Sequence, residues 1–190
     1  MRTGKFFVVA FVSLLAVQGL TAAPPMAAQT PIARGLGALS SLRARFYVTI
    51  EGTKQGKFKG EGRSIDRIEG LRFSYEVAAP HDALTGQTSG RRQHRPLTIT
   101  KEWGASTPQL LQALATNEVL KSVVIEFVRT SPQGREEVYY SIKLTNASIS
   151  DIKQYTDKES MTELEDVSFT FQRIELENRL GGTSAIDDWR

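Results

Sequence analysis

Alternation of apolar and polar residues recurs along most of this chain. It is clear in Phe46–Glu51, in Leu71–Val77 and in Leu97–Lys101. A period of two residues places successive side chains on opposite faces of an extended backbone, so each segment is expected to form a half-buried β-strand. Valine, isoleucine, phenylalanine and threonine, which favour strands, are frequent in these segments.

Further strand signals follow toward the C-terminus. Val123–Arg129 and Glu136–Thr145 flank a turn sequence with proline and glycine, which predicts a hairpin, and Asn146–Lys153 continues as a strand. In the last predicted strand, residues 167–176, the apolar phase shifts by one residue after Phe171. Such a shift predicts a bulge of the kind that bends strands in barrels. About seven short strands without an internal repeat indicate a β-barrel or a β-sandwich.

One helix is expected, at Pro108–Ala115. Ser106 or Thr107 is placed to cap its first turn, where proline is well tolerated, and Gln109 lies three residues after Ser106, which is the spacing of a capping box. The helix is expected to end near Asn117. Its apolar face consists of Leu110, Leu111 and Leu114.

The residue types that carry catalysis or bind cofactors have no recognisable arrangement. The chain contains no cysteine, which excludes disulfides, a thiolate nucleophile and cysteine-based zinc sites. His81 and His94 are its only histidines, and neither has a second ligand at metal-binding spacing. Asp82 is better explained as a turn residue after Pro80. Because the nucleophile-elbow and phosphate-loop motifs are also missing, we expect neither an enzyme nor a metal or cofactor site.

The N-terminus has the composition of an export signal. Arg2 and Lys5 precede the apolar segment Phe6–Leu20, and small residues follow it. We therefore interpret residues 1–28 as a signal peptide. An uncleaved membrane anchor is the alternative, because Phe6–Ala23 just reaches a spanning length.

A short segment separates this leader from the folded part. Residues 29–42 are rich in alanine, proline, glycine and serine and are expected to form a flexible linker, so that the domain occupies residues 43–190. The formal charge of the whole chain is +3. Cleavage of the leader would leave 22 basic and 21 acidic residues, or +1. The charge is therefore a weak argument for nucleic acid or an anionic membrane as partner.

One dense basic cluster stands out, formed by Arg91, Arg92, His94 and Arg95. Three interpretations compete for it. A nucleic-acid site would need interleaved aromatic residues, which the cluster lacks. A solvated loop is the ordinary fate of a run of charges. An assembly loop is the third interpretation, since guanidinium groups suit bidentate bonds to carboxylates on a partner subunit, and the family resemblance given below favours it.

Three stretches together point to a known family. They are Thr85–Leu114, with the basic cluster and the predicted helix, Tyr47–Glu61, and the ending GGTSAIDDW at Gly181–Trp189. Over about residues 43–189 the chain resembles the haemolysin-coregulated protein (Hcp) family of type VI secretion. The resemblance implies a mainly β fold, a compact antiparallel β-barrel with one flanking α-helix. It also implies six copies closing into a ring, with rings stacked into a secreted tube that holds small effectors in its lumen.

The resemblance also implies which residues take part in assembly. Tyr47–Glu51 and the 123–145 hairpin are expected to supply edge strands for ring closure. The C-terminal tail is expected to contact the barrel or a neighbouring subunit through Asp187, Asp188 and Trp189. The ring-stacking loop is expected to comprise Thr85, Gly86, Gln87, Gly90, Arg91, Arg92, Gln93, His94 and Arg95.

The implied partners are further copies of the chain and, within a secretion apparatus, spike and sheath proteins and small effectors. The predicted leader places the chain in the periplasm or outside the cell, whereas typical family members start in the cytoplasm. The alternative function is that of an exported monomeric β-barrel, a binding module that recognises a ligand through its 85–95 loop.

Overall fold

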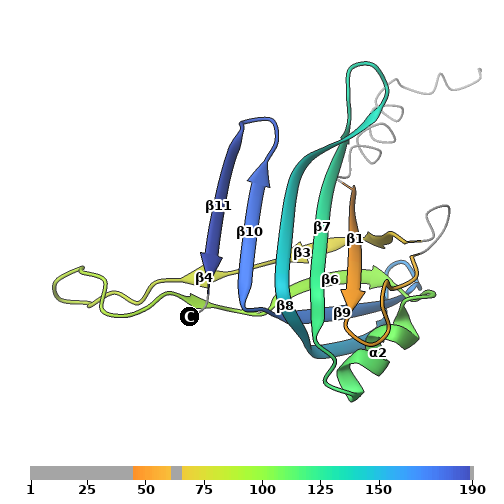
Figure 1. Cartoon of the computed structure of the whole chain (residues 1–190), viewed down its shortest axis with the longest axis horizontal. Helices are drawn as coiled ribbons and strands as arrows, with labels where there is room; N and C mark the ends of the chain where they lie inside the picture. Colours follow the sequence, from red (N-terminus) through yellow and green to blue (C-terminus); the bar gives the residue numbers. More distant parts are fainter. Residues whose placement is uncertain (1–44, 61–65, 189–190) are drawn as a thin grey trace, which may run out of the picture. The chain divides into compact units, whose positions relative to one another are not determined.

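The computed structural model describes residues 45–60 and 66–188 (Figure 1). The predicted signal peptide and linker, and Trp189 of the predicted tail contact, lie outside these residues and stay predictions. Within the described ranges, no helix combines the length and apolar character that crossing a bilayer requires.

The described part is mainly β, with one α-helix. Its strands are short except for β7 and β8, which form a long hairpin. In chain order the elements are β1 Arg45–Gly52, β2 Ile68–Gly70, β3 Arg72–Ser74, β4 Val77–Ala78, β5 Gln93–His94, β6 Leu97–Glu102, α2 Thr107–Ala115, β7 Leu120–Thr130, β8 Glu136–Thr156, β9 Glu163–Thr170, β10 Arg173–Asn178 and β11 Thr183–Asp188.

The main sheet is antiparallel and curves back on itself. Its hydrogen-bonded order is β2-β1-β7-β8-β9-β6-β3, with β10 paired to β8 and β11 paired to β10. The two ends of this path, β2 and β3, are separated in the chain by Leu71 alone, whose N–H donates to Thr100 O at 2.8 Å. The described strands β2 and β3 are therefore connected through the chain itself, and no hydrogen-bonded pairing between them closes the sheet. The predicted fold class, antiparallel β with one flanking helix, is confirmed.

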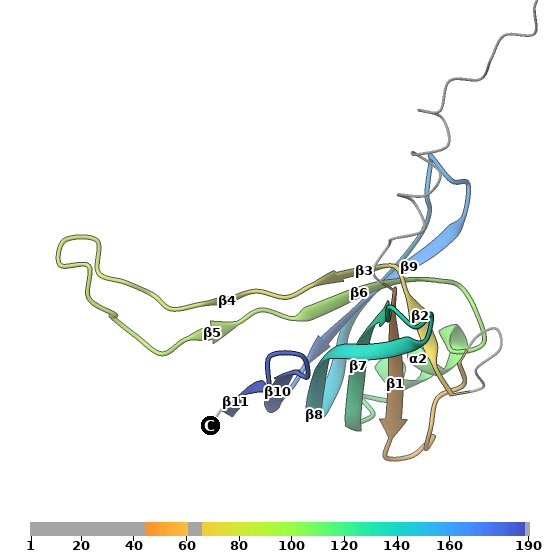
Figure 2. The same ribbon diagram turned by 90° about the horizontal axis from the view of Figure 1, so that it is seen from above.

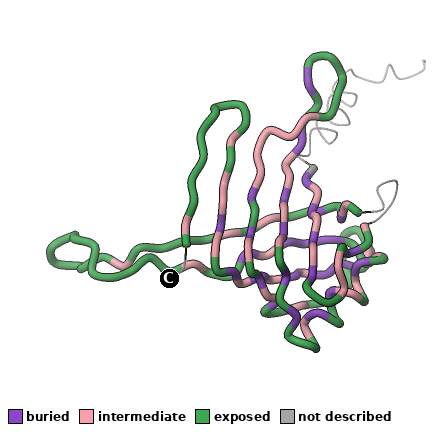
Figure 3. The backbone as a smooth tube through the Cα atoms, viewed as in Figure 1, coloured by how far each residue is buried: buried purple, intermediate pink, exposed green. Residues whose placement is uncertain are grey.

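Alternation sets the core as the sequence predicts. In β1 the inward residues are buried and alternate with partly exposed neighbours, whereas in β6 and β9 the neighbours Thr100 and Leu164 are buried as well (Figure 3). Burial of large aliphatic and aromatic side chains contributes about 1.5–3 kcal/mol each to stability. The core includes Phe46, Val48, Ile50, Leu97, Ile99, Val123, Ile125, Ile142, Leu144, Val167 and Phe169.

The helix forms where proline and the leucine spacing predict it. Leu110 and Ala113 are buried, Leu111 is exposed, and Asn117 adopts a φ of 48° just after the helix. The predicted capping box is wrong, because Ser106 makes no side-chain cap hydrogen bond. Gln109 instead accepts the Lys59 N–H through Oε1 at 2.7 Å, so this side chain holds the loop after β1.

Two of the predicted strands are divided differently in the structure. Residues 71–77 do not form one strand, because β3 belongs to the main sheet and β4 pairs with β5 in a separate two-stranded sheet. The phase shift after Phe171 is not a bulge. It marks the passage from β9, which pairs with β6, to β10, which pairs with the first half of β8. The apolar residues in the second half of β9 and those of β10 each alternate regularly, and the shift between them arises because a new strand begins at Arg173.

The 123–145 hairpin is not an edge of the sheet. Its strand β7 pairs with β1 on one side and with β8 on the other, and β8 pairs further with β10. Its backbone groups are therefore already used within the subunit, and the prediction that this hairpin closes a ring through a free edge is wrong. Tyr47, in β1, is also flanked on both sides, by β2 and β7.

A fully buried ion pair connects the helix to the sheet. Lys101 and Glu165 face each other across β6 and β9, with Nζ and Oε1 3.0 Å apart and both side chains 0 % exposed. Thr107, at the start of α2, donates its hydroxyl to the same oxygen at 2.8 Å. Gln154 donates to the other carboxylate oxygen at 3.1 Å. The pair is well hydrogen-bonded, as a buried charge requires.

Replacing Lys101 by methionine is expected to lower the free energy of unfolding by about 3–5 kcal/mol, because Glu165 would remain buried without its counter-charge. Urea unfolding followed by circular dichroism measures this loss. Lys121→Met is the matched control, since Lys121 pairs with Glu51 at 3.2 Å on the surface. There the loss should stay within about 1 kcal/mol. Equal losses in the two variants would contradict the structural role of the buried pair.

Candidate functional site

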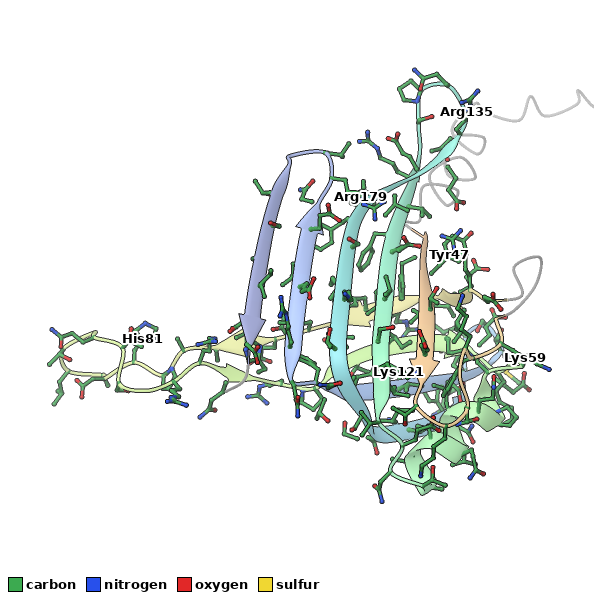
Figure 4. All side chains as sticks on the ribbon, in the orientation of Figure 1. Tyr47, Lys59, His81, Lys121, Arg135 and Arg179 are labelled. Atoms are coloured by element: carbon green, nitrogen blue, oxygen red, sulfur yellow. The ribbon has the colours of Figure 1, made fainter. Side chains whose placement is uncertain are left out.

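A long hairpin extends away from the sheet. We call residues 75–95 the projecting hairpin (Figures 1 and 2). Its two arms pair through β4 and β5, in the register Val77 with His94, and through a bridge between His81 and Thr88 further out. Most of its residues are exposed (Figure 3), and His81 lies in its outer part (Figure 4). A segment with so little contact to its own core is suited to contact another molecule.

The tip of the projecting hairpin is ordered by one carboxylate. Asp82 Oδ1 accepts the N–H groups of Leu84 and Thr85 at 2.9 and 2.8 Å and the Thr85 hydroxyl at 3.0 Å. These hydrogen bonds hold the pKa of Asp82 below its usual value. The backbone N–H groups of Thr85 and Leu84 contribute most to this shift. Gly86, with a φ of 68°, completes the turn. The predicted turn role of Asp82 is confirmed, and the turn presents Leu84, which is 97 % exposed.

The base of the projecting hairpin is joined to the C-terminal strand by four side chains. We call Tyr75, Arg92, His94 and Asp187 the base cluster. Arg92 forms a bidentate ion pair with Asp187 and donates through Nη2 to Asp188 O at 3.1 Å. His94 Nε2 lies 3.0 Å from Asp187 Oδ2, and the Tyr75 hydroxyl lies 2.5 Å from His94 Nδ1. The His94 side chain is only 4 % exposed and also contacts the Phe171 ring edge to face.

The protonation states in the base cluster follow from its environment. Burial lowers the pKa of His94 below 6.5, and the Arg92 guanidinium acts in the same direction. Burial raises the pKa of Tyr75, which Arg92 partly opposes. A neutral His94 then donates Nε2–H to Asp187 and accepts the Tyr75 O–H at Nδ1. A phenol with a raised pKa is a poor nucleophile, so the arrangement favours a structural role over catalysis.

The structure divides the predicted stacking loop into two groups. Thr85, Gly86, Gln87, Gly90 and Arg91 lie in the outer part of the projecting hairpin, and the remaining four residues lie at its base. Two of these four, Arg92 and His94, contact Asp187 of the predicted tail. Sequence analysis thus identified both groups but not their contact.

Sequence analysis missed several participants at the hairpin base. Tyr75 carried no signal beyond its place in an alternating segment, and Glu76, which lies 3.0 Å from the Arg95 guanidinium, carried none. The predicted C-terminal tail is in fact strand β11, paired along its length with β10. Its six residues alternate weakly, which explains why a tail was predicted.

An apolar hollow of about 270 Å³ lies beside the projecting hairpin. Strands β3, β7, β8 and β10 contribute to it. No cluster of three histidine, aspartate or glutamate side chains that could hold a metal ion occurs among the described residues. The lining residues of the hollow are Phe73, Tyr75, Phe127, Tyr139, Tyr140, Ile142 and Leu176.

Comparison with known proteins agrees with this arrangement. Residues 47–177 match the family model described as "Type VI secretion system effector, Hcp". A "Major exported protein" of Pseudomonas aeruginosa is 38% identical over 162 residues, which cover 76% of this chain and 94% of that protein.

Solved Hcp structures have the same fold. A "Crystal structure of Hcp protein" superposes with a TM-score of 0.71 at 31% identity, covering 76% of this chain and 99% of the other. The secreted protein Hcp3 of P. aeruginosa gives 0.66 at 36% identity and covers 77% of this chain and 99% of its own. Because the family model spans more than half of the sequence and the fold agrees with it, the chain belongs to the Hcp family of type VI secretion system effectors.

Proposed function

We propose that this chain is a tube protein that closes into hexameric rings, and that the rings stack into a secreted conduit and chaperone for small effectors. Membership of the Hcp family supports this function. The observation that carries it here is the projecting hairpin, an ordered, exposed extension of a well-packed domain. Such an extension buries little of its own surface in the isolated subunit but can reach an adjoining ring.

Ring closure requires a strand edge that a neighbour can pair with. Among the described strands, β11 pairs with β10 alone, so its outer N–H and C=O groups face away from the subunit. Ile186, on this strand, is a large apolar side chain that is 59 % exposed. We assign ring closure to β11 in place of the 123–145 hairpin, because unpaired edges are completed by strand addition.

Stacking is assigned to the outer part of the projecting hairpin. Thr85, Gly86, Gln87, Gly90 and Arg91 are exposed there. Arg92, His94 and Arg95 lie at the base of the hairpin and contact carboxylates of their own subunit. Arg92 and His94 contact Asp187, and Arg95 contacts Glu76. The tip therefore meets the next ring, and the base determines where the tip lies.

A monomeric binding module that uses the same hairpin is the weaker alternative. The family match favours assembly, and the β11 edge is available for pairing with a neighbour. Spike and sheath proteins and small effectors remain proposed partners. Export through a cleaved leader is likewise a proposal, supported by the composition of residues 1–28 and by the description of the P. aeruginosa relative as an exported protein.

The oligomeric state tests the proposed function directly. Size-exclusion chromatography with light scattering should give a mass of six protomers for the purified chain, because each β11 edge would be completed by a neighbour. Negative-stain electron microscopy should show rings. A monomer at micromolar concentrations, with no circular particles on the grid, would leave only the binding-module alternative.

Charge reversal at the hairpin should separate stacking from ring closure. Arg91→Glu, and the double variant with Arg92→Glu, are expected to abolish tubes in electron micrographs while the hexamer mass is kept. The reason is that both residues lie on the projecting hairpin and outside the core. Arg92 also contacts Asp187 and Asp188 of β11, so the single Arg91→Glu variant is the one that isolates stacking. Arg135→Glu is the control, since Arg135 is exposed on the β7–β8 turn (Figure 4). Tubes of normal length in the Arg91 and Arg92 variants would refute the assembly role of the loop.

Intact-mass spectrometry of the exported protein tests the leader. The expected product lacks the N-terminal segment and begins close after Ala22 or Ala28, where small residues follow the apolar core. Recovery of the full-length chain in the membrane fraction would instead favour the uncleaved anchor.

A further inference from the structure

The projecting hairpin is held to the rest of the subunit by few contacts. Its strands β4 and β5 form a two-stranded sheet of their own, outside the hydrogen-bonded order of the main sheet. Two-stranded hairpins are marginally stable in water, and nothing in their own pairing fixes the direction in which they point. The direction must therefore be set where the hairpin leaves the domain.

The base cluster supplies side-chain contacts at that point. Arg92 and His94 lie on one arm of the hairpin and Tyr75 at the foot of the other, and all three converge on Asp187 directly or through His94. Asp187 belongs to β11, more than 90 residues further along the chain, and its register partner is Ile174 in β10. The carboxylate is thus fixed by the main sheet, whereas the groups that it binds belong to the hairpin.

We propose that β11 is a clamp for the projecting hairpin, that Asp187 is its positioning residue, and that protonation of His94 releases the clamp so that ring stacking weakens in acid while the rings persist. The inference rests on the proposed function, because stacking is the process that a correctly directed hairpin serves. It also assigns a role to β11 beyond ring closure, since one strand would then connect the lateral contact to the axial one.

The chemistry of the cluster is suited to holding a direction. A bidentate guanidinium–carboxylate pair is stronger and more directional than a single hydrogen bond. Asp187 Oδ2 is shared between Arg92 Nε and His94 Nε2, so one carboxylate holds both the guanidinium and the imidazole. The neighbouring Arg95–Glu76 pair at 3.0 Å joins the two arms to each other but not to the sheet. Among the described residues, Arg92 is joined to the main sheet through Asp187 and Asp188 of β11.

The clamp contains a histidine, the side chain whose ordinary pKa lies nearest to neutral pH. The titratable and charged groups that face His94 are Tyr75 from the hairpin foot, Arg92 from the same arm and Asp187 from β11, and Phe171 packs on its ring. Since burial and Arg92 lower the pKa of His94, the folded cluster favours the neutral ring. The stabilisation is present above the ordinary pKa of 6.5 and is lost as the pH falls through the lowered value. Protonation at Nδ1 would remove the acceptor of the Tyr75 O–H and place a second cation beside Arg92.

Direction matters because a ring presents six hairpins at once. When all six point the same way, engagement of one places the others at high effective concentration for their sites. A hairpin that samples many directions loses this advantage, because simultaneous contact requires matching geometry. Loosening the clamp is therefore expected to shorten the tubes strongly, even where each single contact between a hairpin and the next ring is only slightly weakened.

The lack of cysteine makes the direction of the hairpin measurable. Leu84→Cys at the exposed tip and Lys121→Cys on the surface of β7 accept one spin label each. Electron–electron double resonance on the full chain, diluted with unlabelled protein, gives the distribution of tip-to-sheet distances. Asp187→Asn and, from the other partner, Arg92→Gln should broaden this distribution. Glu137→Gln is the matched control, because it removes the surface pair with Arg129.

Tube length and ring mass are measured on the same variants without labels. Shorter tubes with an unchanged hexamer mass in Arg92→Gln, which lies outside β11, but not in Glu137→Gln, would support the clamp. A distance distribution as narrow in both clamp variants as in the parent would overturn it. Because the distance measurement does not depend on assembly, the absence of rings in the parent would refute the proposed function and leave the clamp to be judged by the distances.

Acid supplies a readout that a passive structural contact would not give. As the pH falls below 6.5, the ordinary histidine value, the parent should show a broader distance distribution and shorter tubes. His94→Gln, which can still donate to Asp187 but does not titrate, should respond much less. An identical acid response in the parent and in His94→Gln would overturn the release by protonation.

Discussion

The architecture depends on one long strand that serves two parts of the sheet. β8 runs without interruption from Glu136 to Thr156, pairing in its first half with β7 and β10 and in its second half with β9. The change of partners occurs at Asn146, which has a φ of 51° and donates to Gln172 at 3.1 Å. Asparagine tolerates this conformation better than most residues. The bend allows one strand to take part both in the enclosed core and in the extension that carries β10 and β11.

This division separates the source of stability from the proposed source of function. The buried alternating residues and the Lys101–Glu165 pair lie in the enclosed part, where they stabilise the subunit by itself. The projecting hairpin and β11 add little buried apolar area. They carry the polar and backbone groups that an assembly would use. A protein of this kind can therefore fold before it assembles, and its assembly contacts can be tuned without loss of the core.

The basic cluster illustrates how charges that look free in a sequence are used within the fold. Arg92 and His94 contact Asp187, and Arg95 contacts Glu76, so these side chains have carboxylate partners inside the subunit. A nucleic-acid surface would need these cations to be available to phosphates. The internal pairing disfavours that interpretation. Arg92 and His94 instead serve to hold the projecting hairpin against β11.

The sequence by itself indicated most of the described strands, the helix at Pro108–Ala115 and the family. Periodicity reports which face of an element is buried, and this depends on local residues such as Phe46, Val48 and Ile50, while Pro108 and Leu110 mark the helix. The position of Lys101 in the buried phase was visible, but its partner Glu165 was not, because the pairing of β6 with β9 joins residues far apart in the chain. The tertiary structure alone decided that the phase shift after Phe171 separates two strands, that the 123–145 hairpin lies inside the sheet, and that Asp187 meets Arg92. Each of these depends on which strands lie side by side, and alternation reports the face of a strand but not the identity of its neighbour.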